Sequence, residues 1–295
     1  MHLYTSSVGF SKIKERDFID WVQKNNALQS ADYKDYSRNI DRGFALIPVS
    51  KNTALYSTYL EGEIKTIAPM VEGIEYDLPM EIEVERHSMT ETFSVCTDGI
   101  KTGATIIFYL VNTYDYLINS QELEYDWNVR NTLKALRVKL GALAVSGMVL
   151  LPVSMEMKYA DKYLDALSAR KELLKAAKDG DEQAMESLTI EDLDTYAEIS
   201  RRITHEDVFT IVDSSFMPIG VECDIYSVVG EILSVEIQEN TFTKEEMYVM
   251  ELDCNDLKLR VAINVKNLLG EPSVGRRFKG QIWLHGEVVF NMSDK

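Results

Sequence analysis

The sequence predicts an α+β fold in three parts: an N-terminal antiparallel β-rich α+β domain at residues 1–153, a helical bridge at 154–207, and a C-terminal OB-like five-stranded β-barrel at 208–295. The first part has short β-branched and aromatic runs broken by Pro, Gly, Asn and Asp. The second is rich in Ala, Leu, Lys and Glu, with apolar residues three and four apart. In the third, apolar residues or glycine alternate with mostly polar ones from Phe278 to Phe290, which predicts a strand with one buried face.

The N-terminal part is expected to begin with a helix and to continue with strands. Phe18, Ile19 and Val22 share one face of a helix over about Glu15 to Lys24. The strands expected after it are Ala45 to Val49, Leu55 to Leu60, Met80 to Glu85, Thr92 to Cys96, Thr105 to Val111 and Lys134 to Leu143. Asp98-Gly99 predicts a tight connection, so the two strands that flank it are expected to pair.

The helical bridge has clear start and stop signals. Gly180 can take the left-handed conformation that ends one helix, and Asp181 can accept the free amides that begin the next. Thr189 with Asp192 predicts the start of a third helix that runs to about Ile203.

The C-terminal part has the strand lengths of a small barrel. Its expected strands are Ile225 to Ile237, Met247 to Asp253, Leu257 to Val265, and one or two strands from Arg276 to Phe290. Residues Cys254 to Asp256 predict a turn, and Lys266 to Val274 a single helical turn. Barrels of this type bind ligands far more often than they catalyse reactions.

Composition limits the classes of partner and compartment. The 295 residues with 45% apolar content suit two or three domains, and the net charge of −17 disfavours nucleic acids and anionic membranes. Three cysteines without CxxC spacing argue against disulfides and zinc, and favour the cytoplasm. No secretion signal is recognised, and the longest apolar run, Met148 to Val153, is too short to span a membrane. We expect no cofactor and no metal.

Four stretches carry a resemblance that covers the whole chain: VERHSMTETFSVCTDGIKTGATIIFYLVN, GMVLLPV, FMPIGVECDIYSVVGEIL and LLGEPSVGRRFKGQIWLHGEV. They resemble an uncharacterised bacterial family of about 290 residues, of unknown function, found mainly in anaerobic Gram-positive bacteria. The resemblance implies a soluble bacterial protein. It implies no activity and no site residue.

No standard catalytic motif occurs. There are four histidines, and no HExxH, GxSxG, GxxxxGK[ST] or GxGxxG pattern. The acids around Asp179 and Asp181 lack the alternate-ligand pattern of a calcium loop, and helix capping explains them. The sequence leans towards a protein that is not an enzyme.

Glu85, His87 and Cys96 are the catalytic candidates, because a nearby imidazole can activate a thiol. If His87 lies opposite Phe93, Cys96 is on the other face of the sheet. If His87 lies opposite Thr92, Cys96 shares its face at a distance of about 13 Å along the strand. Neither register forms a dyad, so a buried structural role for Cys96 is favoured.

The binding candidates are Arg260, Arg276, Arg277, Lys279 and Trp283. Cations with aromatic residues are typical of sites for single-stranded nucleic acid. Here, however, the cations alternate with core residues in an acidic segment, which favours a carboxylate-rich protein partner or the chain's own acidic helices.

The leading hypothesis is a non-enzymatic cytoplasmic interaction or scaffold protein that uses the barrel, and a homo-oligomer is compatible with it. The alternative is a small-ligand-binding protein or an enzyme, with Tyr109, Tyr114, Tyr116 and Trp127 lining a cleft in the N-terminal domain. The third hypothesis is single-stranded nucleic-acid binding by the barrel.

Overall fold

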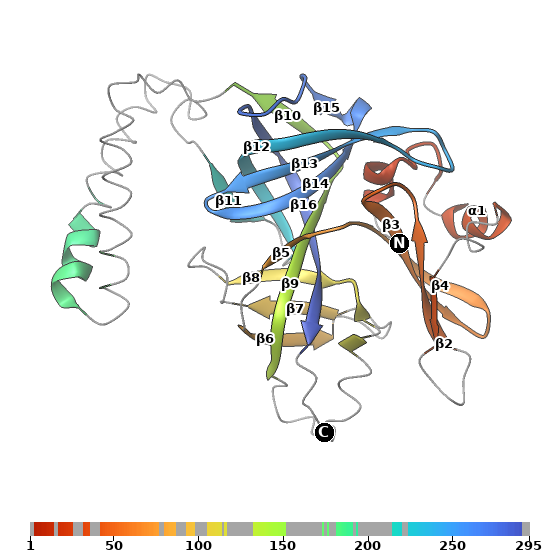
Figure 1. Cartoon of the computed structure of the whole chain (residues 1–295), viewed down its shortest axis with the longest axis horizontal. Coiled ribbons are helices and arrows are strands. Elements are labelled where there is room, and N and C mark those ends of the chain that lie inside the picture. Colours follow the sequence, from red (N-terminus) through yellow and green to blue (C-terminus); the bar gives the residue numbers. More distant parts are fainter. Residues whose placement is uncertain are drawn as a thin grey trace. The chain divides into compact units, whose positions relative to one another are not determined.

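The structure is a computed structural model. It describes residues 3–14, 17–25, 32–35, 42–76, 80–86, 93–97, 105–113, 115–116, 132–151, 173, 176, 181–190, 193, 214–219 and 224–290. Contacts divide the chain into two compact units, Met1–Leu150 with Ser214–Lys295, and Leu151–Asp213. The described part of the first unit is mostly β, with two sheets (Figure 1).

The smaller sheet is an antiparallel meander of consecutive strands. Its order is β1 (Asp32–Asp35), β2 (Arg42–Pro48), β3 (Thr53–Leu60) and β4 (Glu63–Val71). Glu61 and Gly62 both have positive φ in the two-residue turn between β3 and β4, which is the geometry that tight hairpins favour.

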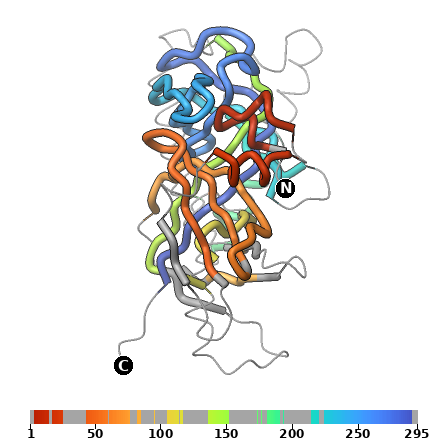
Figure 2. The backbone as a smooth tube through the Cα atoms, turned by 90° about the vertical axis from the view of Figure 1, so that its right-hand side faces the viewer, coloured from red at the N-terminus to blue at the C-terminus, as the bar shows by residue number. Residues whose placement is uncertain are grey.

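The larger sheet has twelve strands and takes them from both halves of the sequence. They are β5 (Ile74–Tyr76), β6 (Met80–Arg86), β7 (Phe93–Thr97), β8 (Ile106–Leu110), β9 (Thr132–Ala144), β10 (Gly147–Leu150), β11 (Ser215–Pro218), β12 (Ile225–Glu239), β13 (Glu246–Cys254), β14 (Leu257–Asn264), β15 (Leu268–Leu269) and β16 (Arg277–Phe290). Strand β9 pairs with β5, β6, β14 and β16, so it joins the early strands to the late ones. In Figure 2, β9 in yellow-green and β16 in blue run together.

This topology contradicts the predicted fold class. The C-terminal part does not form a closed five-stranded barrel, because β9 from the N-terminal part lies between β14 and β16. The two β-rich parts are therefore not separate domains joined by a helical bridge. Alternation along the chain identifies strands, but it does not say which strands pair when their residues are more than one hundred positions apart, as Ala142 and Leu284 are.

The hairpin predictions are confirmed. Strands β7 and β8 pair antiparallel, as the Asp98-Gly99 connection predicts. Asn255 and Asp256 have positive φ in the two-residue turn between β13 and β14. The final run is a single strand, β16.

The helical segments are short. In the described part of the first unit they include the 3-10 helices η1 (Leu3–Val8) and η4 (Val265–Asn267) and the helix α1 (Phe18–Lys24), which confirms the expected N-terminal helix and the helical turn before the last strand. In the second unit residues 182–190 are helical, and Asp181 caps them by accepting from the amides of Gln183 and Ala184. Thr189 does not start a third helix, because it lies within this one and donates to the Met185 carbonyl. Of the other predicted helices the structure describes only Leu173, Ala176 and Leu193, which are helical.

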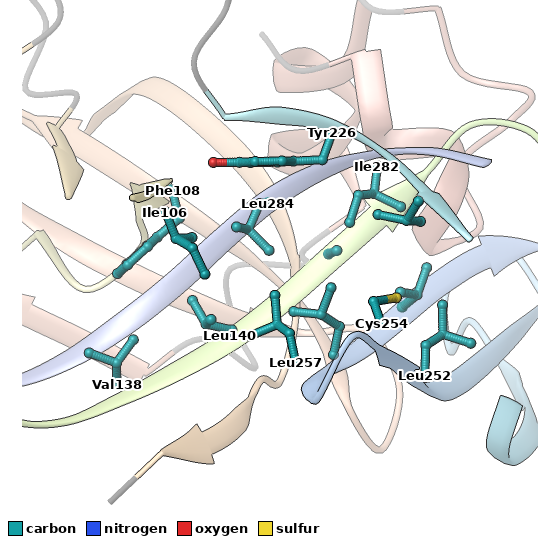
Figure 3. Close-up of a cluster of buried hydrophobic side chains, with 14 of the residues drawn as sticks. Ile106, Phe108, Val138, Leu140, Tyr226, Leu252, Cys254, Leu257, Ile282 and Leu284 are labelled. Carbon is teal, nitrogen blue, oxygen red and sulfur yellow. The ribbon is translucent and has the colours of Figure 1, made fainter. Parts of the chain in front are cut away.

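Strand β16 is buried on both faces in its middle, which corrects the prediction of one buried face. Ile282 and Leu284 enter the core that Figure 3 shows, with Leu140 and Leu257. Trp283 enters a second core with η1, α1 and β4. The same strand therefore holds two layers of side chains together.

Candidate functional site

The catalytic candidates lie on β6, β7 and just after β6. Glu83 pairs with Cys96 and Arg86 with Phe93, which agrees with the second of the two registers expected from the sequence. His87 and the side chains of Glu85 and Cys96 lie outside the described residues.

Two of the binding candidates form hydrogen bonds to other parts of the protein. Arg260 on β14 donates to Glu251 at 2.9 Å and to the Glu72 backbone carbonyl at 3.0 Å. Trp283 is 2% exposed, and its indole N–H donates to Asp224 at 2.8 Å. A buried indole has no face on which a base could stack.

The other three binding candidates lie together at the start of β16. Arg276 donates to the Glu271 carbonyl at 2.8 Å. Arg277 is buried opposite Leu150, and Lys279 is partly buried opposite Met148. The structure thus separates the candidates into a group beside β10 and two residues elsewhere.

Apolar side chains are exposed beside that group. Met148 on β10 pairs with Leu269 on β15 and with Lys279 on β16, so the three side chains form one row across the sheet. Leu269 is 70% exposed and Met148 is 37% exposed. We call this row, with Lys266 of η4 beside it, the edge face.

A second polar arrangement lies where β4 crosses β9. Gly141 of β9 is in register with His285 on one side and Arg260 on the other. A Cβ on Gly141 would lie 2.5 Å from the Val71 carbonyl oxygen and 3.0 Å from His285 Nε2. We call Val71, Glu72, Gly141, Arg260 and His285 the strand crossing. Only glycine at position 141 lets the end of β4 approach this closely.

His285 holds the end of β4 in the strand crossing. Its Nε2 lies 3.0 Å from the Val71 amide nitrogen, which donates to it, and 3.1 Å from the Val71 carbonyl oxygen. Its Nδ1 is buried and has no hydrogen-bond partner among the described residues. Burial lowers the pKa of His285 from 6.5 to about 4, although backbone groups of Val71 and Trp283 act in the opposite direction.

Aromatic rings connect His285 to the surface. The Trp283 ring lies 5.0 Å from His285 and 5.1 Å from Tyr109. Tyr109 and Asp224 are partly exposed, and burial, with Asp224 second, raises the pKa of Tyr109 to about 12. Of the four aromatics predicted to line a cleft, Tyr116 packs on Phe290 in the core, and Tyr114 and Trp127 lie outside the described residues.

Among the side chains that the structure describes there is neither a metal site nor a reactive thiol. No group of three or more His, Cys, Asp or Glu side chains among them could hold a metal ion. Cys254 is buried, and burial raises the pKa of its thiol to about 12, so it stays protonated at neutral pH. No helix within the described ranges is long and apolar enough to span a membrane.

Sequence reasoning missed His285, Asp224 and Gly141. The alternation from Phe278 to Phe290 places His285 among the polar positions of the strand, between Leu284 and Gly286. The sequence signal for its role is weak: a histidine two residues after a tryptophan in the middle of a long strand.

One protein-family model matches residues 5–286, and its description is "Domain of unknown function, E. rectale Gene description (DUF3881)". This confirms the resemblance found in the sequence. No curated protein and no solved structure matches the chain.

Proposed function

Since the chain belongs to the DUF3881 family, whose function is unknown, we propose a function from its geometry: it is a non-enzymatic cytoplasmic protein that binds a protein partner through the edge face. The observation that carries this proposal is the pairing of exposed Met148 with exposed Leu269. Exposed apolar side chains that adjoin one another favour a binding surface more than single exposed ones do.

The position of β15 supports strand-edge recognition. Among the described residues β15 pairs with β10 alone, so its other edge leads out of the sheet. Such an edge offers backbone groups to a partner strand. Gly270, with a φ of 91°, follows directly and ends the strand after two residues, which limits the site to a short segment of partner.

Nearby cations indicate the chemistry of the partner. Lys266 is exposed just before β15, and Lys279 lies in the same row as Met148. We infer a partner segment with an apolar side chain for Met148 and Leu269 and a carboxylate at the rim. The net charge of −17 opposes an acidic partner at long range. Because salt screens this repulsion as well as the attraction of the two lysines, binding should depend little on salt.

The test uses the full chain as bait in an extract of its native host. The variant Leu269→Asp places a charge in the edge face, and Ile237→Asp is the matched control, because Ile237 is also exposed but lies on β12. We expect one protein to be captured by the wild type and by Ile237→Asp, and at least about tenfold less by Leu269→Asp.

Two outcomes contradict the proposal. Capture that is equal for both variants shows that the edge face does not bind. Recovery of a small molecule and no protein supports the second candidate function instead.

A second copy of this chain as the captured protein supports a homo-oligomer through the same face, and sedimentation of the two variants then differs.

The second candidate is small-ligand binding beside Tyr109 and Asp224. It is favoured by the unpaired Nδ1 of His285 beneath Trp283 and by the partial exposure of Asp224. Native mass spectrometry of protein purified from the host tests it. We expect the wild type to carry a bound small molecule, seen as added mass, and Asp224→Asn to lack it. The same mass of ligand in the wild type and in Asp224→Asn, or no ligand in either, rules out this site.

A further inference from the structure

We propose that the strand crossing is a proton-operated latch between the two sheets: neutral His285 holds the end of β4 against β9, and a proton on His285 releases it. The inference is independent of the edge face. It rests on the hydrogen bond from the Val71 amide to Nε2 and on the close approach of the Val71 backbone at Gly141.

Protonation removes the acceptor on which β4 depends. Neutral imidazole has one lone pair, and here it accepts the Val71 amide hydrogen at Nε2. Imidazolium has no lone pair, so the Val71 amide loses its partner in a buried site. The charged ring can turn its Nε2–H towards the Val71 carbonyl oxygen, which lies 3.1 Å away, but an ion is then buried without a counter-ion.

Among the residues that the structure describes, no carboxylate is a hydrogen-bond partner of His285. Glu72, next to Val71, is engaged by Arg260 and Asn52. Arg260 itself adds a like charge on the β14 side. Other titratable groups on the elements that pack here include Lys139 and Glu287, which pair at 3.9 Å, Tyr109 on β8, Tyr4 on η1, and Asp224, which accepts from Trp283.

Release of Val71 would loosen the connection between the sheets. Val71 is the last residue of β4, and Glu72 and Gly73 lead directly to β5, which pairs with β9. A Cβ on Gly73 would lie 2.6 Å from the Leu140 amide nitrogen, so the connecting backbone also lies flat on β9. The elements that move are therefore β4, the two-residue connection and β5.

Linkage sets the size of the effect. His285 has a pKa of about 4 when held and an ordinary value of 6.5 when released. The equilibrium constant for opening should then increase about 60-fold from pH 7 to pH 4.5.

Amide hydrogen exchange on the full chain tests the latch. After correction for intrinsic exchange, we expect the Val71 amide to lose protection about 60-fold from pH 7 to pH 4.5. The control amide is that of Met250, in the middle of β13 between β12 and β14, and it should change far less. Equal loss at both amides, or no loss at Val71, overturns the proposal.

A variant separates the imidazole proton from other acid effects. His285→Gln can accept the Val71 amide hydrogen through its side-chain oxygen and does not titrate, so its Val71 protection should not depend on pH. If this variant does not fold, the ¹⁵N shifts of the His285 ring in the wild type decide. An ordinary titration near pH 6.5 while Val71 stays protected overturns the latch.

Discussion

The start and the middle of β16 lie in opposite environments. Around Lys279 the strand pairs with β10, whose Met148 is exposed, and exposed Leu269 lies one strand further out on β15, whereas four to six residues later Trp283 and His285 are almost completely buried. Apolar side chains of the neighbouring strands are thus exposed beside the start, and a polar ring is buried in the middle. Burial of the polar His285 ring is unfavourable, and the hydrogen bond at its Nε2, which joins the two sheets, offsets part of this cost. No comparable contact explains why Leu269 is exposed, which is why we assign binding to the surface beside the start of the strand.

The largest effect should come from the titration of His285 in the middle of β16, measured as the difference between the wild type and a variant without this imidazole. The folded pKa of His285 is depressed to about 4, so the unfolded chain binds more protons between pH 6.5 and pH 4. Its contribution to stability is complete above pH 6.5 and is lost as pH falls towards 4. We expect a loss of about 3 kcal/mol from this residue.

Urea denaturation of the wild type and of His285→Gln at pH 7, 5.5 and 4 measures this loss. Carboxylates that titrate in both proteins cancel in the difference. A difference between the two proteins that is constant across these pH values contradicts the prediction.

Gly141→Ala should break the strand crossing without changing any charge. The added Cβ would meet the Val71 carbonyl and His285 Nε2, and backbone must shift to relieve the contact. We expect a loss of about 2 kcal/mol in the free energy of unfolding, measured by denaturant titration. Leu136→Ala on the same strand is the control, because Leu136 is largely exposed. Equal losses for the two variants would mean that β9 tolerates a side chain at the crossing.

Local features of the fold could be predicted from the sequence, and long-range ones could not. The turn at Asn255 and Asp256 and the cap at Asp181 were correct because adjacent residues determine them. The sequence predicted two alternative registers for β6 and β7, and the structure has one of them. A short hairpin allows few registers, so the set of alternatives was small. The position of β9 between β14 and β16 depends on residues far apart in the chain, and the fold class was therefore wrong.

The candidate site shows the same limit. Alternation places a residue on one face of a strand, but it cannot say whether another layer covers that face. His285 and Trp283 are covered by η1, α1 and β4, which come from the start of the chain. The cations beside β10 were found from sequence because they adjoin one another along it: Arg276, Arg277 and Lys279.

Arg260→Met tests the second contact of the strand crossing. It removes the bonds to Glu251 and to the Glu72 carbonyl but keeps much of the apolar stem. We expect a loss of about 1 kcal/mol, because the side chain is mostly buried. Arg137→Met removes an exposed pair with Glu75 and should cost less than about 0.5 kcal/mol. Thermal unfolding of both variants compares them, and an equal shift would mean that Arg260 acts as an ordinary surface charge.

Leu269→Asp should have the smallest effect on stability and the largest on binding, which sharpens the contrast between the two parts of β16. The Leu269 side chain is mostly in solvent, so its replacement should change the free energy of unfolding by less than about 0.5 kcal/mol. Denaturant titration of the purified variant measures this. A loss of about 2 kcal/mol would show that Leu269 packs within the fold, and its exposure would then no longer support a binding surface.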